Sequence, residues 1–168
     1  PAYDNDCTDD YLIREFTLEE LKGLRRRQRY STRNTDLDDL FQIMTFEEVI
    51  EQMQGLYQSH PKTRPWKIGL YVETNLYQFY LDNYGENIAQ MTYDVLKKYG
   101  LETIDKCKDT MPIIIECFEG ESLQYLSKIT DLPLIYLMGE DFTTAMQMLP
   151  ELATYSHGIG PTQELIFE

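Results

Sequence analysis

Apolar and polar positions along the chain fall into blocks whose spacing predicts a series of helices. Two blocks open with the pattern Thr-x-x-Glu, at Thr17 to Glu20 and at Thr45 to Glu48. In such a capping box, the threonine hydroxyl and the glutamate carboxylate each accept a hydrogen bond from a backbone N–H that the helix start leaves unpaired. We therefore expect a short helix after Thr17 and a longer one that ends near Ser59.

Three further helices are predicted in the second half of the chain. The clearest spans Ile88 to Tyr99, where apolar residues recur three and four positions apart and Gly100 follows as a left-handed stop. The last is expected from Phe142 to Leu152, with a break at Pro150 because proline lacks the N–H that a helix interior requires. The apolar positions of the helix between these two are Leu123, Leu126 and Ile129.

Four short apolar segments between these helices are predicted to be strands. Strands that are apolar on both faces and alternate with amphipathic helices form parallel sheets covered by helices. The fold class is therefore α/β, as an open doubly wound sheet or as part of a (β/α)₈ barrel. The segments are Lys67 to Glu73, Pro112 to Cys117, Pro133 to Met138 and Gly158 to Gly160.

Charge narrows the range of partners. The 168 residues carry a formal net charge of −14, from 15 basic and 29 acidic side chains. This negative field disfavours nucleic acid or an anionic membrane surface as a partner. No apolar run approaches the roughly 18 residues of a spanning helix, so no transmembrane segment is expected. Residues Lys22 to Arg33 hold six bases and no acid, which indicates either a solvated helix end with its loop or an anion-binding site.

Histidine and cysteine offer little for catalysis. His60 and His157 each precede a turn, which favours structural roles for both. The cysteines, Cys7, Cys107 and Cys117, lack the C-x-x-C spacing of zinc sites and redox motifs. At most one internal disulfide is possible, and pairing between Cys107 and Cys117 stays open.

Acidic residues at strand ends are the main candidates for chemistry, because active residues of parallel α/β folds lie at the carboxyl ends of strands. Glu73 ends the first apolar strand, where a carboxylate requires a cation or hydrogen bonds unless it reaches solvent. A metal ligand and a solvated strand-end glutamate are both open interpretations. Glu116 poses the same question one strand later, and Glu140 and Asp141 follow the third strand.

Seven segments carry a family resemblance through their order along the chain. They are FTLEELKGLRRRQRYSTRN (Phe16 to Asn34), FQIMTFEEVIEQMQ (Phe41 to Gln54), IGLYVETNLYQFY (Ile68 to Tyr80), VLKKYG (Val95 to Gly100), IIIECF (Ile113 to Phe118), LPLIYLM (Leu132 to Met138) and GIGP (Gly158 to Pro161). Together they resemble the glycerophosphodiester phosphodiesterases over nearly the whole chain. The similarity is closest to the bacterial periplasmic forms and to the eukaryotic secreted or surface-anchored forms.

The resemblance implies a (β/α)₈ TIM barrel of the phosphodiesterase type. Such a barrel needs about 250 residues, so these 168 residues correspond to about two thirds of one, without the amino-terminal strands and the closing stretch. We expect residues 1–168 to form a single partial-barrel domain, with an irregular segment and a short helix over 1–45 and βα units over 46–168. Further chain or another polypeptide is expected to complete the barrel, because open sheet edges favour aggregation.

The resemblance also implies the residues of the site. The metal-binding glutamate of the family's E-I-K motif falls on Glu73, and its lysine, which meets the substrate phosphate, falls on Asn75. The family's Q-S-F or Q-C-F strand end falls on Glu116, Cys117 and Phe118, so Asn75, Glu116 and Phe118 are the expected substrate-binding residues. Nothing in these 168 residues matches the family's His-Arg-Gly and Glu-x-Asp segments, so no catalytic acid or base is assigned here.

The implied activity is metal-dependent hydrolysis of a glycerophosphodiester to glycerol 3-phosphate and an alcohol. The implied cofactor is a divalent cation, calcium in preference to magnesium, and the implied location is extracellular or at the cell surface. Asn75 and Glu116 both make the pocket more negative than the family pattern, which weakens charge stabilisation of a phosphate. The alternative is therefore a catalytically impaired barrel that acts as an interaction or acidic calcium-binding matrix protein.

Overall fold

The computed structural model describes residues 11–59, 68–139, 142–163 and 166. The chain divides into two compact units, residues 1–52 and 53–168, and the boundary falls within one helix, α2 (Phe46–Ser59). Of the residues considered above, Cys7, His60, Glu140 and Asp141 lie outside the described part of the chain.

The first unit contains two short helical elements and the start of α2. They are a 3₁₀ turn, η1 (Ile13–Glu15), and α1 (Leu18–Gly23). The capping box at Thr17 is confirmed, because the Glu20 N–H donates to the threonine hydroxyl and the Thr17 N–H donates to the glutamate carboxylate. The second box is confirmed in the same way, with Thr45 and Glu48 exchanging equivalent bonds of 2.8 and 3.2 Å at the start of α2.

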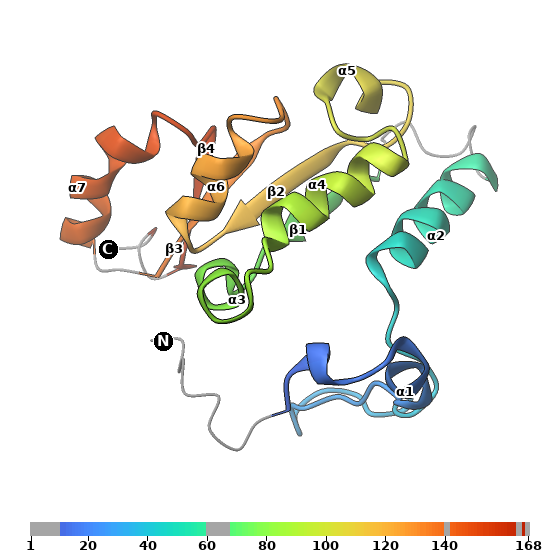
Figure 1. The fold of residues 1–168 in the computed structure, drawn as a ribbon. Coiled ribbons are helices and arrows are strands. Elements are labelled where there is room, and N and C mark those ends of the chain that lie inside the picture. Colours follow the sequence, from blue (N-terminus) through green and yellow to red (C-terminus); the bar gives the residue numbers. More distant parts are fainter. Residues whose placement is uncertain (1–10, 60–67, 140–141, 164–165, 167–168) are drawn as a thin grey trace. The chain divides into compact units, whose positions relative to one another are not determined.

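The second unit is built on a four-stranded parallel sheet in the order β1-β2-β3-β4 (Figure 1). The strands are β1 (Leu70–Glu73), β2 (Ile113–Cys117), β3 (Leu134–Met138) and β4 (Gly158–Pro161). Strand order follows chain order, so every crossover advances in one direction, and right-handed crossovers place their helices on one face. A doubly wound sheet requires a reversal of strand order. The sheet is therefore singly wound.

Helices connect successive strands on one side of this sheet. Between β1 and β2 run α3 (Tyr77–Tyr84), α4 (Ile88–Lys98) and α5 (Ile104–Cys107), whereas α6 (Gly120–Leu126) joins β2 to β3 and α7 (Phe142–Leu152) joins β3 to β4. Helix α6 packs on β2 and β3 and also contacts α3 and α4. Figure 1 shows α4 and α6 over the same face.

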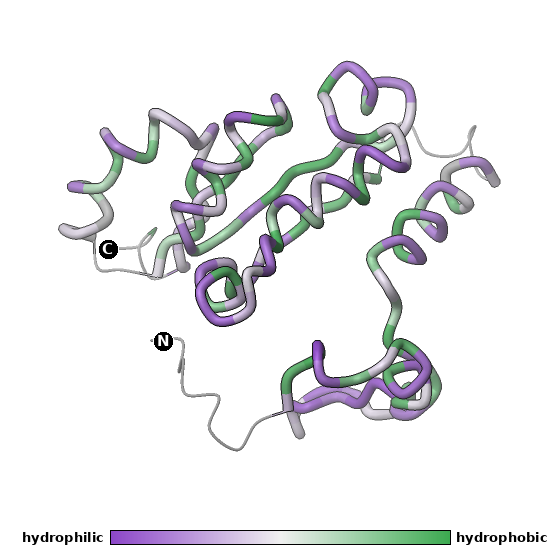
Figure 2. The backbone as a smooth tube through the Cα atoms, in the orientation of Figure 1, coloured by the Kyte–Doolittle hydropathy of each residue, from purple (hydrophilic) through white to green (hydrophobic). Residues whose placement is uncertain are grey.

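The two faces of the sheet differ in burial. Residues alternate along β2 and β3 between fully buried positions beneath the helices and partly exposed positions on the opposite side. Figure 2 shows the strongly hydrophobic character of β2. We call the more exposed side the open face. Its side chains are those of Tyr71, Glu73, Ile114, Glu116, Ile135 and Leu137.

Several sequence predictions are confirmed, and two are wrong in detail. The predicted helix at Ile88 is present as α4, with Gly100 at a φ of 67° after its end. Pro150 does not interrupt α7, because it lies near the helix end and the carbonyl left without its N–H partner belongs to exposed Met146. Helix α6 ends at Leu126, so Ile129 lies in the following turn.

The predicted strands are all present, but three of them begin later than their flanking prolines suggested. Strand β1 begins at Leu70, where the backbone N–H donates to the Pro112 carbonyl at 2.9 Å.

Cys107 and Cys117 are buried free thiols, so they do not pair. In the described part of the chain, no helix combines the length and the apolar character needed to cross a bilayer.

Candidate metal and substrate site at the carboxyl ends of the strands

Glu73 and Glu116 lie side by side at the carboxyl ends of neighbouring strands. Glu73 is the last residue of β1, and its register partner in β2 is Glu116, one residue before that strand ends. Paired residues of parallel strands project to the same face, so both carboxylates lie on the open face. The topology thus brings together the two acids that the sequence proposed separately.

The carboxylate pair is electrostatically unfavourable as it stands. Partial burial and, second, the negative charge of Glu116 raise the pKa of Glu73 above its usual value. The Glu73 side chain still reaches solvent, so it is not enclosed in the way that a fully buried carboxylate would be. Such a pair is relieved by a nearby cation, and carboxylate oxygens are the ligands that calcium and magnesium prefer.

Tyr71 is a neighbour of this pair that the sequence analysis did not identify. It lies two residues before Glu73 on the open face and is 54% exposed. Burial and, second, the neighbouring Glu116 carboxylate raise the pKa of the Tyr71 phenol. Tyr71 therefore stays protonated at neutral pH and lies near one of the two acids.

A buried polar network holds the backbone just after Glu73. The Thr74 and Ser122 hydroxyls share a hydrogen bond of 2.7 Å, and both residues are fully buried. The Cys117 thiol donates to the Thr74 carbonyl at 2.9 Å, and the Thr74 N–H donates to the Glu116 carbonyl at 3.0 Å. Burial raises the pKa of the Cys117 thiol, so it serves this network as a neutral group.

The turn that follows carries Asn75, the position where the family pattern has lysine. Asn75 is exposed, and the next residue, Leu76, has a left-handed backbone with φ at 56°. A non-glycine residue in this conformation is strained and must be held by its surroundings. Glu119 contributes from the segment after β2, because its carboxylate accepts from the Gln78 N–H in the first turn of α3 at 3.2 Å.

The expected site residues all come from the ends of β1 and β2. The structure pairs Glu73 with Glu116, and it places Asn75 in the turn after β1 and Phe118 directly after β2. Phe118 is 39% exposed. Among the described residues, no group of three or more His, Cys, Asp or Glu side chains converges, so the local donor set is the glutamate pair.

His157 lies in a different part of the second unit and has a structural role. Its ring Nδ1 accepts from the Leu134 N–H at 3.2 Å, and its own N–H donates to the Leu134 carbonyl at 2.8 Å. These bonds join the starts of β3 and β4, at the opposite ends of the strands from Glu73 and Glu116. The prediction that His157 is structural is confirmed by this geometry.

The second unit is an α/β arrangement in which four parallel strands alternate with helices, and two acids lie at the carboxyl ends of β1 and β2. The sequence profile of the Glycerophosphoryl diester phosphodiesterase family matches residues 4–159 of this chain. The chain therefore belongs to the glycerophosphoryl diester phosphodiesterase family, whose members generally use a divalent metal ion.

Curated relatives support the assignment at modest identity. The chain is 30% identical over 171 residues to the Glycerophosphodiester phosphodiesterase GDPD6 of Arabidopsis thaliana, across 90% of this chain and 44% of that protein. It is 31% identical over 125 residues to the Glycerophosphodiester phosphodiesterase of Haemophilus influenzae, across 68% of this chain and 32% of the relative. The chain thus spans less than half the length of these relatives. No solved structure matches it significantly.

Proposed function

We propose that the protein hydrolyses glycerophosphodiesters to glycerol 3-phosphate and an alcohol with the help of a divalent cation. Family membership supports the reaction class. The observation that carries the proposal onto this chain is the register pairing of Glu73 with Glu116 at the carboxyl ends of β1 and β2. Because the chain spans less than half of its relatives, the activity is proposed for the protein that contains these residues.

For the fold, we propose that the four βα units are part of the wall of a (β/α)₈ barrel. Sequential strand order with helices on one face is the arrangement of such a wall, and the open face is then the barrel interior. Gly158 and Gly160 support this, because a Cβ at either position would press against Ile135 or Leu137 on that face. Further strands, from the same or another polypeptide, would then pair with β1 and β4.

Each site residue has a role consistent with its position. A bound cation would polarise the phosphate oxygens and offset their charge. Glu73 would hold this cation, and the Asn75 amide would donate to the substrate. Glu116 would accept from a substrate hydroxyl, and Phe118 would pack against the carbon atoms of the alcohol.

The test is release of glycerol 3-phosphate from glycerophosphocholine by the protein that contains residues 1–168. We expect release with added calcium, its loss when EDTA removes the metal, and its loss in Glu73→Gln. The matched control is Glu151→Gln, at an exposed position of α7, which should retain activity. Metal-dependent release that is unchanged in Glu73→Gln would refute the assignment of Glu73.

Asn75 and Glu116 favour a second candidate, a catalytically impaired barrel that acts as an interaction or acidic calcium-binding matrix protein. Two adjacent glutamates and an amide in place of lysine make the site more negative, which repels a phosphodiester. The double variant Asn75→Lys with Glu116→Gln distinguishes the candidates. Hydrolysis gained from a silent parent supports the impaired barrel, whereas an active parent excludes it.

We propose calcium in preference to magnesium, and an extracellular or cell-surface location. Exposed carboxylates on strand ends can accommodate the larger and more variable coordination shell of calcium. Calorimetric titration with each ion tests the first proposal, and tighter binding of magnesium would refute it.

The location is supported by the family resemblance alone, and detection of the protein in the culture medium or at the cell surface tests it.

A further inference from the structure

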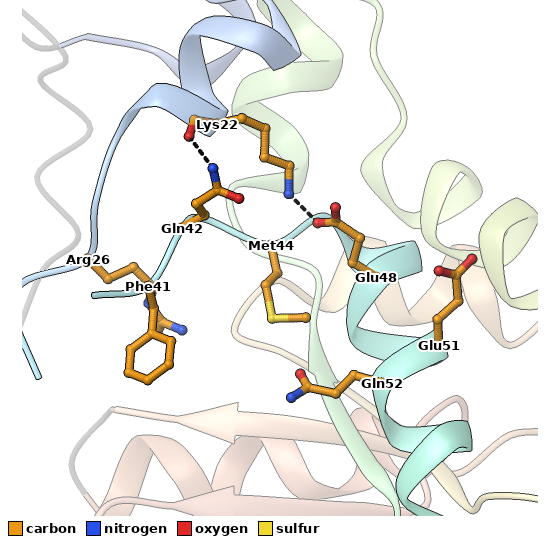
Figure 3. Close-up of a pocket in the computed structure, with 8 residues that line it drawn as sticks. All are labelled: Lys22, Arg26, Phe41, Gln42, Met44, Glu48, Glu51 and Gln52. Carbon is orange, nitrogen blue, oxygen red and sulfur yellow. Dashed lines mark hydrogen bonds and ion pairs between the residues drawn. The ribbon is translucent and has the colours of Figure 1, made fainter. Parts of the chain in front are cut away.

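The loop between α1 and α2 separates basic from acidic residues. Residues 25–33, which we call the arginine arm, hold five arginines and no acid, whereas residues 34–42, the aspartate arm, hold three aspartates and no base. Backbone bonds join the two arms. The Arg26 N–H donates to the Phe41 carbonyl at 2.8 Å, and the Asp39 N–H donates to the Arg26 carbonyl at 3.0 Å. Figure 3 shows Arg26 beside Phe41 where the arms meet, so the loop has a defined conformation within the first unit.

The aspartate arm neutralises only one of the five arginines. The Arg27 guanidinium lies 3.9 Å from the Asp38 carboxylate and 3.1 Å from that of Asp39. Asp36 bonds instead with Asn34, through its own N–H at 2.7 Å and through the asparagine amide at 3.1 Å. Four arginines of the arm have no carboxylate partner within the part of the chain that the structure describes. They are Arg25, Arg26, Arg29 and Arg33.

Two of these four arginines lie over the same tyrosine ring. The Arg33 N–H donates to the Tyr30 carbonyl at 3.1 Å, and this turn brings Arg33 back toward Tyr30. The guanidinium carbons of Arg29 and Arg33 lie 4.7 and 4.9 Å from the centre of the Tyr30 ring, and the Arg29 guanidinium donates to the phenol oxygen at 2.6 Å. Cation–π attraction to the shared ring offsets the repulsion between the two cations. Tyr30 therefore holds two positive charges close together without an acid to neutralise them.

The arginine arm has the chemistry of a site for a linear polyanion. Runs of basic residues at this density are typical of surfaces that bind nucleic acids or sulfated polysaccharides, and the planar guanidinium donates two parallel N–H bonds to one oxyanion. Single-stranded nucleic acids also stack their bases on aromatic rings. Here Arg29 and Arg33 lie over the Tyr30 ring that such stacking would use. The contacts therefore favour a polyanion that carries sulfate groups and no bases.

The aspartate arm disfavours an anionic membrane as the partner. Its apolar side chains Leu37 and Leu40 are 62% and 64% exposed, but Asp36, Asp38 and Asp39 are their neighbours in sequence. Insertion of these leucines into a bilayer would bring three carboxylates to a negatively charged surface, where they are repelled. A single polysaccharide chain is narrow enough to contact the arginine arm alone.

We propose that the arginine arm binds a sulfated polysaccharide. Arg29 and Arg33 are the main contacts and donate to sulfate oxygens, whereas Tyr30 positions both guanidiniums. The net charge of −14 opposes this binding only weakly, because exposed charges more than about 8 Å away are screened at physiological ionic strength. The site is separate from the proposed hydrolysis, since Glu73 and Glu116 belong to the second unit.

The test is calorimetric titration of the protein that contains residues 1–168 with a heparin dodecasaccharide. EDTA is present, because a divalent cation could bridge sulfates to carboxylates. We expect saturable binding at physiological ionic strength, weakened at least about tenfold in Arg29→Gln with Arg33→Gln, because charge-assisted hydrogen bonds are lost. The matched control, Lys97→Gln with Lys128→Gln, removes two exposed charges from the second unit and should bind as the parent does. The dodecasaccharide without sulfate groups should not bind.

Tyr30→Leu distinguishes a preformed site from diffuse attraction between charges. This variant keeps every charge but removes the ring under Arg29 and Arg33, so the affinity should fall about two- to fivefold. Tyr30→Phe keeps the ring and should bind more tightly than Tyr30→Leu. The double variant Arg27→Gln with Asp39→Asn also leaves the net charge unchanged, and it should retain the affinity of the parent. Equal binding by the parent and Tyr30→Leu would refute the positioning role of Tyr30.

Two further probes separate the classes of partner. Tighter binding of single-stranded DNA than of the dodecasaccharide would assign a nucleic acid, and flotation with phosphatidylserine vesicles without heparin binding would assign a membrane. Either result would overturn the proposal. So would the absence of saturable binding, equal binding of the oligosaccharide without sulfate groups, or equal losses in the two double variants that remove positive charges. Loss of hydrolysis with this binding intact would contradict only the proposed function.

Discussion

Thr74 and Ser122 share a 2.7 Å hydrogen bond between two hydroxyls that are completely shielded from solvent. One follows the last residue of β1, and the other lies in α6, so the bond ties the end of the strand to the helix that covers its neighbours. This contact, with the Cys117 thiol on the Thr74 carbonyl, fixes the backbone on which Glu73 and Asn75 are displayed.

Breaking this bond should destabilise the second unit. Thr74→Val leaves the Ser122 hydroxyl buried without that partner, which costs about 1–3 kcal/mol of the free energy of unfolding. The double variant Thr74→Val with Ser122→Ala should cost less than the sum of the single variants, because the second change removes the unsatisfied group. Urea unfolding measures all of these. Thr154→Val, at an exposed hydroxyl, is the control, and additive losses would show that the two hydroxyls do not interact.

The carboxylate pair predicts a pH-dependent gain in stability when one charge is removed. The pKa of Glu73 is raised in the folded protein, so its ionisation opposes folding above that pKa, and the penalty vanishes below the pKa of the unfolded chain. Glu116→Gln should therefore raise the free energy of unfolding of the metal-free protein at neutral pH, by an amount that shrinks on acidification. Urea unfolding in EDTA at neutral and acidic pH checks this. An equal effect at both pH values would show that charge repulsion is not its cause.

A bound divalent cation should make the Glu73 carboxylate stabilising instead of destabilising. A divalent cation that binds the folded state through Glu73 stabilises it by mass action, and Glu73→Gln should lose this stabilisation. Thermal unfolding with and without calcium measures the difference, and Glu151→Gln should respond as the parent does. A calcium-induced rise in the midpoint that Glu73→Gln retains in full would place the ion elsewhere.

The ion pair between Glu102 and Lys106 should affect stability with a pH dependence opposite to that of Glu73. Burial acts to raise the pKa of Glu102, but the Lys106 ammonium and neighbouring groups hold it below its usual value. The resulting stabilisation is present above the unfolded-state pKa and is lost as pH falls through the folded-state pKa. Lys106→Met should lower the free energy of unfolding at neutral pH, and it should lower it less in acid.

The matched control for that change is Lys108→Met. Lys108 pairs with Asp105 at 3.0 Å, but both side chains are exposed, so its loss should have little effect. Urea unfolding of the two variants across the same pH range compares them directly. Equal losses would mean that the burial of Glu102 does not matter to the ion pair.

Replacing either of two glycines by alanine should change the free energy of unfolding, in opposite directions for the two positions. A Cβ at Gly69 would lie 2.5 Å from the Pro112 carbonyl oxygen, where the first backbone bond between β1 and β2 forms. Gly69→Ala should therefore cost about 1–3 kcal/mol through displaced backbone. Gly55 lies inside α2 with open space around it, so Gly55→Ala should gain up to about 1 kcal/mol. Chemical unfolding measures both, and a neutral Gly69→Ala would show that the strands can separate there without cost.

Local chemistry made much of the fold predictable. The capping boxes at Thr17 and Thr45 and the left-handed Gly100 act through neighbours within one helical turn, so the sequence specifies them directly. Helix α3 was missed for the opposite reason. Leu76, at its N-cap, offers no side-chain hydrogen bond, and the acceptor for its first turn is Glu119, more than forty residues later.

The candidate site also has features that local sequence predicts and features that depend on contacts between distant segments. The sequence alone determined that acids end two apolar strands and that the ordered motifs belong to a phosphodiesterase family, because both depend on residue type and spacing. Only the tertiary structure decided that Glu73 and Glu116 are register partners and that Tyr71 lies near Glu116 on the same face of the sheet. Register, crossover direction and side-chain pairing join segments far apart in the chain, and no local pattern encodes the distances between them.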